Sequence, residues 1–226
     1  MCGRFTLATP PEILAALFEV DGFSDWNDPR YNIAPRTKVV TVRRTPGRRI
    51  VQSLIWGAIN PRDSRRLINA RSETAATSPL FAGAFAASRV LIPADGFFEW
   101  TKAGTRRQAR YFRLPDSGPF AFAGISVNPP AAGEPGDPCA VLLTTRASES
   151  VRDYHDRMPL IVPPRDFERW LDEGTDPKAV IDLMSPGPQT QWTSHTVGPL
   201  VNNVRNDNPE NIRRAEPAPE PQGSLF

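Results

Sequence analysis

Apolar and polar residues alternate over short stretches through the middle of the chain, which is the pattern of half-buried β-strands. Residues 38–43 (KVVTVR) and 49–55 (RIVQSLI) flank the turn sequence TPGR and predict a hairpin. Further along, the segments between apolar stretches are rich in Gly, Pro and Asp, which are typical turn residues. The apolar stretches there predict five more strands, at 90–93, 97–102, 109–114, 120–126 and 140–145.

Helical patterns are confined to the two ends of the chain. Residues 9–18 predict a short helix, with Thr9 as its cap, two prolines in its first turn and an apolar face after them. Residues 164–171 and 177–184 predict two more helices. This order favours the α+β class, with a single domain on a mostly antiparallel, barrel-like β-sheet and short flanking helices.

Composition supports a single domain with an appended tail. The chain has 226 residues, of which 39% are hydrophobic, and its 25 prolines favour short strands and turns over a helix bundle. We assign residues 1–208 to the domain. Residues 209–226 contain four prolines and show no apolar periodicity until the last few positions, so we predict a disordered tail there.

Charge and cysteine content narrow the class of protein. The net charge is only +2, and 24 of the 27 basic residues are Arg, which suits phosphate binding but also follows from a GC-rich genome. Two cysteines are too few for a disulfide framework, and neither a secretory signal nor an apolar run of about 18 residues is present. We therefore expect a cytoplasmic protein with no membrane partner.

Metal and nucleotide sites find no support in the sequence. The two cysteines and two histidines are not closely spaced, and no P-loop or GxGxxG motif occurs. We expect no metal and no cofactor.

Cys2 is the first candidate for chemistry. Removal of Met1 would leave an α-amine and a thiol on adjacent carbons, a pair that no internal cysteine offers. An α-amine has a pKa of about 8, so part of it is neutral at physiological pH and can condense with an aldehyde to an imine. The thiolate, a strong nucleophile, can then close a thiazolidine ring. The alternative is that Cys2 is only a small buried residue.

Four other polar residues lie in settings that allow two interpretations. Glu99, between two aromatic residues, either faces solvent or lies in a pocket that would raise its pKa for acid–base work. His155 is either a surface residue in a polar turn or a proton-transfer group. Asn69 can orient a ligand or hold a turn, and Arg71 can meet phosphate or pair with Glu73.

Seven ordered motifs together resemble the SOS-response-associated peptidase (SRAP) family, over almost the whole chain except the tail. They are MCGRF at the start, YNIAP at 31–35, WG at 56–57, LINARSET at 67–74, PADGFFEW at 93–100, HDRMP at 155–159 and VNNVRND at 201–207. Several motifs in one order are far more specific than any one of them.

The resemblance implies a function and a set of roles. SRAP proteins form a reversible thiazolidine crosslink with abasic sites in single-stranded DNA, through an N-terminal Cys exposed by removal of their own Met, and some incise the strand. Peptidase activity would then be limited to self-processing of Met1. By position, Cys2 would crosslink, Asn69 would orient the N-terminus and the sugar, and Glu99 would move the amine protons. His155 would protonate the sugar oxygen, and the phosphates near the lesion would meet Arg4 and Arg71.

One departure from the family lies in residues 58–66 (AINPRDSRR). Many members carry an aromatic residue there that wedges between bases, and stacking of this kind contributes ~1–3 kcal/mol per base. This chain has Arg62, Arg65 and Arg66 instead. We predict weaker and more salt-sensitive DNA binding than in an aromatic-bearing relative.

The C-terminus carries a second resemblance. QGSLF, at 222–226, is similar to the bacterial sliding-clamp-binding pentapeptide, with Gln222, Leu225 and Phe226 at the expected places. The alternative is a chance hydrophobic terminus. The expected partners are thus single-stranded DNA with abasic sites and a replication sliding clamp, for a monomeric protein associated with the nucleoid.

Two other functions remain open at this point. An N-terminal-nucleophile amidohydrolase also begins with MCG, but it usually continues as MCGI, and its glutamine-binding motifs are not recognisable here. A non-covalent reader of single-stranded or modified DNA would use Cys2 only structurally.

Overall fold

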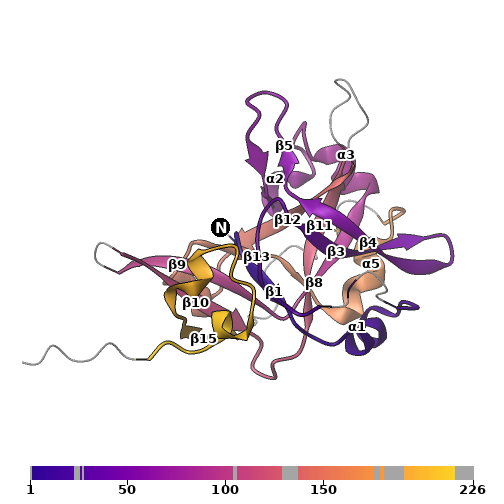
Figure 1. Ribbon diagram of the computed structural model, residues 1–226. Helices are drawn as coiled ribbons and strands as arrows, with labels where there is room; N and C mark the ends of the chain where they lie inside the picture. The colour runs from indigo at the N-terminus through magenta and orange to yellow at the C-terminus, as the bar shows by residue number, and fades with distance from the viewer. Residues whose placement is uncertain are drawn as a thin grey trace, which may run out of the picture.

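The computed structural model describes residues 2–22, 26, 28–103, 106–128, 137–175, 179–180 and 191–216. Strands form the body of the molecule, and short helices lie around it (Figure 1). The strands are β1 (Phe5–Leu7), β2 (Arg30–Ile33), β3 (Lys38–Thr45), β4 (Arg48–Trp56), β5 (Ala58–Ile59), β6 (Arg66–Leu67), β7 (Asn69–Arg71), β8 (Arg89–Ala94), β9 (Gly96–Ala103), β10 (Arg106–Arg113), β11 (Phe120–Val127), β12 (Cys139–Arg146), β13 (Arg157–Pro159), β14 (Ile161–Val162) and β15 (Thr193–Thr196).

The helices are short. They are α1 (Pro11–Phe18), α2 (Ser72–Ala75), α3 (Ala82–Ala87), α4 (Glu149–Arg152) and α5 (Phe167–Leu171), with the 3₁₀ turns η1 (Pro164–Asp166), η2 (Pro199–Asn202) and η3 (Pro209–Ile212). None of the helices in the described ranges has the length and apolar character needed to cross a membrane. The predicted α+β class is confirmed.

The larger sheet closes on itself. Strand β4 pairs with β3, β3 with β8, β8 with β11, and β11 with β12, all antiparallel, and β12 returns to β4 in parallel. Two further strands pair with β12, β7 in parallel and β13 antiparallel. The ends of β7, β12 and β13 therefore lie side by side at one edge.

A second sheet has the order β15-β10-β9-β1-β2. One continuous hydrophobic core joins it to the ring of strands. Phe5 on β1 packs edge-on against Trp56 of β4 and Phe122 of β11, with ring centroids 5.2 and 5.5 Å apart. Burial of Phe5 thus fixes the N-terminal strand, and with it residue 2, against the closed sheet.

The hairpin and the five central strands that the apolar pattern predicts are confirmed. The first helix begins at Pro11 rather than Thr9, and Thr9 does not cap it. The N–H and hydroxyl of Thr9 instead donate to Asp95 Oδ2, at 2.8 and 3.0 Å. The predicted helix at 164–171 is a 3₁₀ turn followed by α5, and most of 177–184 lies outside the described residues.

The ordered chain continues past residue 208, the predicted domain boundary, as far as residue 216. Asn208 and Asn211 form a capping box on η3, and Asn211 is buried. The backbone N–H of Ala215 donates to the carbonyl of Thr196 at 2.8 Å, which ties the segment to β15. The last ten residues, 217–226, lie outside the described residues, so the disordered tail and the clamp motif remain predictions.

Candidate functional site

Cys2 is fully buried just before β1. Its carbonyl accepts a hydrogen bond of 2.8 Å from Asn69 Nδ2, and its Sγ lies 3.7 Å from the carbonyl oxygen of Arg4. Asn69 is the first residue of β7 and pairs in register with Leu142 of β12. A side chain on the closed sheet therefore holds the main chain of residue 2.

The WG motif explains why β7 lies where it does. Trp56 is buried, and its Nε1 donates to the carbonyl of Ile68 at 3.0 Å, directly before Asn69. Gly57 has φ of +101°, and a Cβ there would lie 2.7 Å from Arg66 Cγ and 2.9 Å from Ile68 Cγ2. Only glycine fits this left-handed, crowded position. The motif is thus a support for Asn69.

Glu99 lies on β9 with 3% of its surface exposed, so the solvent-facing interpretation is wrong. Burial raises its carboxyl pKa from 4.5 to about 7. Burial also raises the pKa of the Cys2 thiol, and the negative charge of Glu99 raises it further, which shows that the two groups share one electrostatic environment. At neutral pH, Glu99 can both accept and donate a proton.

His155 lies in the turn between α4 and β13. Its Nδ1 accepts the backbone N–H of Arg157 at 2.9 Å and lies 2.8 Å from Asp156 Oδ1. Partial burial lowers the pKa of the imidazole, which favours the neutral ring at pH 7. A neutral ring that accepts this N–H at Nδ1 has its proton on Nε2, whereas the Asp156 carboxylate beside Nδ1 favours a proton on Nδ1.

Arg157 holds this turn in place. Its guanidinium makes two parallel bonds to Glu73, at 2.6 and 2.8 Å, and a third of 2.5 Å to the carbonyl of Thr144. The bonds from Arg157 lower the pKa of Glu73. Glu73 is thus paired with Arg157, and the alternative pairing of Arg71 with Glu73 is not formed among the described residues.

Arg4 lies beside the reactive residue but has internal partners. Its Nη1 donates to Asn32 Oδ1 at 2.5 Å and to the carbonyl of Val201 at 2.7 Å. Its guanidinium carbon lies 5.5 Å from the centroid of the Trp100 ring. At least one nitrogen of the Arg4 guanidinium, Nη1, therefore bonds within the protein.

Sequence reasoning passed over Asn32 and Asp207, which connect two distant motifs. Asn32 is buried, and its Nδ2 lies within hydrogen-bond distance of three carbonyls of the 201–207 segment, those of residues 201, 203 and 206. Asp207 Oδ1 accepts the backbone N–H groups of Tyr31, at 2.5 Å, and Asn32, at 3.0 Å. We call Arg4, Asn32 and the 201–207 segment the N-terminal anchor.

The β5–β6 hairpin carries the three arginines that replace the aromatic wedge. Arg62 and Arg65 are exposed at its turn. Arg66 is half-buried, and its Nη1 donates to the carbonyl of Gly57. Two of the three are therefore available to solvent, and the third also supports the WG turn.

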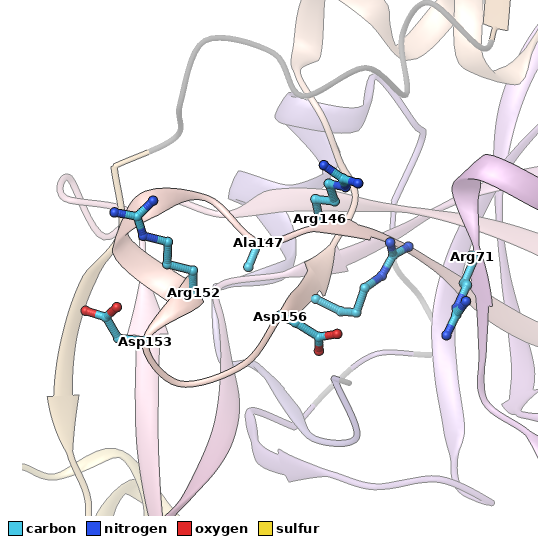
Figure 2. Close-up of a pocket in the computed structure, with 7 residues that line it drawn as sticks. Arg71, Arg146, Ala147, Arg152, Asp153 and Asp156 are labelled. Carbon is cyan, nitrogen blue, oxygen red and sulfur yellow. The ribbon is translucent and has the colours of Figure 1, made fainter.

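A concave pocket of about 600 Å³ opens next to this site (Figure 2). Arg71, a predicted DNA contact, lines it. Arg146 and Arg152 also line it. The sequence did not predict these two, because nothing in their local sequence sets them apart from other surface arginines. The lining residues are Arg71, Arg146, Ala147, Arg152, Asp153, Asp156 and Arg157, which we call the arginine pocket.

Comparisons with known proteins agree with this arrangement of motifs. The profile of the family described as SOS response associated peptidase (SRAP) matches residues 1–204. Two curated relatives are the abasic site processing proteins YoqW of Bacillus subtilis (strain 168) and YedK of Escherichia coli (strain K12). Each is 34% identical and aligns over 94% of this chain and 99% of its own length.

Solved structures have the same fold. A protein from Bacteroides thetaiotaomicron matches with a TM-score of 0.79 at 21% identity, over 95% of this chain and 100% of that chain. A phage-related protein from Bordetella bronchiseptica matches with a TM-score of 0.73 at 28% identity, over 87% of this chain and 94% of that chain. Since the family profile covers nearly all of the described domain and the curated relatives align end to end, this chain belongs to the SRAP family.

Proposed function

We propose that this protein processes abasic sites in single-stranded DNA by forming a reversible thiazolidine through Cys2, once Met1 has been removed by self-processing. The observation that carries the proposal is the 2.8 Å hydrogen bond from Asn69 Nδ2 to the Cys2 carbonyl. It holds residue 2 in the electrostatic environment of the buried Glu99. The abasic-site names of the curated relatives support the substrate.

The reaction joins one aldehyde to one aminothiol and releases one water. The α-amine of Cys2 adds to the aldehyde carbon of the opened sugar, and the resulting carbinolamine loses water to give an imine. The sulfur then adds to the imine carbon while the nitrogen takes the thiol proton. Reversal follows the same steps backwards.

Glu99 suits the proton transfers of the first stage. With a pKa of about 7, its carboxylate can take a proton from the ammonium form of the amine, and the acid can return it to the departing hydroxyl. An exposed carboxylate, with an ordinary pKa near 4, would be a poor acid at neutral pH.

The order of events follows from the thiol. Because burial and the charge of Glu99 raise the pKa of Cys2, the thiol is protonated at neutral pH before substrate arrives. A protonated imine beside it brings a positive charge, which favours the thiolate. The amine therefore reacts first, and the sulfur closes the ring afterwards.

Asn69 and His155 suit the handling of the sugar. Asn69 Oδ1 is buried and has no hydrogen-bond partner among the described residues, so it offers an acceptor to a substrate hydroxyl or to the amine. The Nε2–H of a neutral His155 can donate to the ring oxygen and favour the open aldehyde. Arg71 would meet a nearby phosphate.

Strand incision is a branch of the same path. If the imine persists, loss of a proton from the neighbouring sugar carbon expels the 3′ phosphate. Ring closure by sulfur removes the carbon–nitrogen double bond and stops this elimination. The thiol therefore decides between a stable crosslink and a lyase reaction.

The test is intact-mass analysis and a denaturing gel after mixing the protein with a single-stranded oligonucleotide that contains one abasic site. Wild type should give an adduct equal to the protein lacking Met1 plus the oligonucleotide less one water. Cys2→Ala, prepared without Met1, should give strand incision without the stable adduct, and a form that retains Met1 should give neither. Cys139→Ser removes the other free cysteine and should leave the adduct intact. If wild type forms no adduct, the proposal is wrong.

A further inference from the structure

The arginine pocket continues the sheet face that holds Cys2. In the β7–β12 pairing, Asn69 is opposite Leu142 and Arg71 is opposite Thr144, and in the β12–β13 pairing Arg146 is opposite Arg157. Directly paired residues, and residues two apart on one strand, share a face. Asn69, Arg71, Arg146 and Arg157 therefore share one face.

This face leads away from the reactive residue in one direction. From Leu142, which pairs with Asn69, to Arg146 is four residues along β12, or about 13 Å at the usual rise of a strand. Figure 2 shows Arg152 and Asp153 on the left of the pocket, Arg71 on the right, and Arg146 and Asp156 between them. A strand reacting at Cys2 would meet this pocket on one flank of the lesion only.

The charge balance of the pocket favours an anion. Among the described residues, four arginines and two aspartates line it. The guanidinium groups of Arg71 and Arg146 have no ion-pair or hydrogen-bond partner in the described ranges, and both residues are exposed. Arg152 meets Glu149 at 3.2 Å on an exposed helix turn, a pair that contributes little. Arg157 differs from these three because it is committed to Glu73.

The lining points to phosphate rather than to a base. Guanidinium groups bind phosphate oxygens with two parallel hydrogen bonds. None of the described residues that line the pocket is aromatic, so these residues offer no surface on which a base would stack. A volume of about 600 Å³ leaves room for a phosphate and part of its sugar.

We propose that the arginine pocket is a second phosphate subsite, in which Arg146 and Arg152 bind the backbone of the DNA strand on one flank of the abasic site. The proposal rests on the proposed function for the identity of the ligand. It adds to the lesion-proximal contact predicted for Arg71. The phosphate is either an internal diester or the terminal monoester at a strand break.

The first experiment measures binding without crosslinking. A single-stranded oligonucleotide carries a tetrahydrofuran analogue of the abasic site, which has no aldehyde, and fluorescence anisotropy follows affinity against salt. The slope of log affinity against log salt becomes shallower by about 0.7 for each phosphate of a single strand that the protein no longer neutralises. Arg146→Ala/Arg152→Ala should therefore reduce the slope by about 1.4, on the same principle.

A matched control removes two other exposed arginines, Arg48 and Arg165, each of which has only a weak ion pair of 3.6–3.7 Å. Arg48 lies on the β3–β4 hairpin, which projects from the right of Figure 1. Arg48→Ala/Arg165→Ala should leave the slope unchanged. An unchanged slope in the pocket variant, or an equal fall in the control, would overturn the proposal.

The second experiment locates the contact. Methylphosphonates replace single phosphates, one position at a time, and remove their charge. Wild type should lose affinity at one or two adjacent positions on one flank, and the Arg146→Ala/Arg152→Ala variant should be insensitive there. An equal loss in wild type and variant would contradict a contact at the pocket. Oligonucleotides that end at the sensitive position, with and without a terminal phosphate, distinguish the monoester from the diester.

Crosslinking separates this proposal from the proposed function. At saturating abasic DNA, the pocket variant should crosslink at a rate within about twofold of wild type, with a higher half-saturating DNA concentration, because a flank contact acts on binding rather than on the reacting atoms. If wild type forms no adduct but the salt slopes still differ, the subsite stands and the crosslinking proposal fails. If the adduct forms and the slopes do not differ, the crosslinking proposal stands and the phosphate subsite fails.

Discussion

Arg4 and Arg71 both belong to the motifs around Cys2, yet their surroundings differ. Arg4 is half-buried in the N-terminal anchor, where it donates to Asn32 and Val201 and lies over Trp100. Arg71 is exposed in the arginine pocket and has no partner in the part of the chain that the structure describes. One residue type, in motifs of one site, therefore serves the fold in the N-terminal anchor and is available to a ligand in the arginine pocket.

The two regions should therefore fail in different ways. Loss of a buried side chain from the anchor leaves buried carbonyl or N–H groups without partners, which costs stability. Loss of a side chain from the arginine pocket leaves only solvated groups, which costs affinity for an anion. Stability and salt dependence are thus the two measurements that separate the regions.

Asn32→Ala should have the largest effect. Its Nδ2 has two N–H groups to share among the three carbonyls within reach, its Oδ1 accepts from Arg4, and each buried group left unsatisfied costs about 1–3 kcal/mol. We expect the free energy of unfolding to fall by about 3 kcal/mol on that principle. Urea denaturation measures it, with Asn202→Ala as the control because Asn202 is exposed and accepts one bond from Trp100. Equal losses in the two variants would show that the anchor is not a buried network.

Asn69→Ala should have the next largest effect, on rate rather than stability. The side chain holds the Cys2 carbonyl, and misplacement of a reacting group by about 1 Å costs about 100-fold in rate. Single-turnover crosslinking at saturating DNA measures it, alongside an unfolding curve that should shift less than that of Asn32→Ala, because only the Cys2 carbonyl loses its partner. Asn69→Asp keeps the shape but replaces the donor with oxygen, so it should be as slow. A fast Asn69→Asp variant would remove Asn69 from its proposed role.

The sequence predicted the strands well because alternation is a local property, read within a few residues. The ring closes through the pairing of β12 with β4, two strands far apart in the sequence, and no pattern in either strand predicts this pairing. Asp207 and Asn32 are 175 residues apart, so their bond was also invisible in sequence. Glu99 had two interpretations because neighbouring aromatic residues fix which face it occupies, but not what covers that face.

Glu99→Gln tests the buried carboxyl through pH. The folded state raises the pKa of this group from 4.5 to about 7, so it binds the proton more tightly than the unfolded chain does. Stability of the wild type therefore falls as pH rises from about 4.5 to 7, and the deficit persists above that range. At about 1.4 kcal/mol per pKa unit, the variant should gain roughly 3 kcal/mol over wild type at pH 8.5 and almost nothing near pH 4.

Urea denaturation at the two pH values measures this gain, and Glu149→Gln, at an exposed helix position, should show none. Crosslinking by Glu99→Gln should be slow and should lose the pH dependence that titration near pH 7 gives the wild type. A variant that is fast, or that is destabilised at pH 8.5, would contradict the proton-transfer role.

Arg71→Ala and Arg4→Ala give the smallest effects and the most direct comparison. Arg71→Ala should reduce the salt slope of DNA binding by about 0.7, the value for one single-strand phosphate contact, and leave the unfolding curve in place. Arg4→Ala should lower the free energy of unfolding by about 1–2 kcal/mol, because two hydrogen bonds of its guanidinium disappear. If Arg4→Ala also reduces the slope by a similar amount, Arg4 meets phosphate as the family resemblance implies, and the anchor itself is part of the DNA surface. If Arg71→Ala changes stability and not the slope, the distinction between the two regions is wrong, because an arginine without protein partners would then be serving the fold.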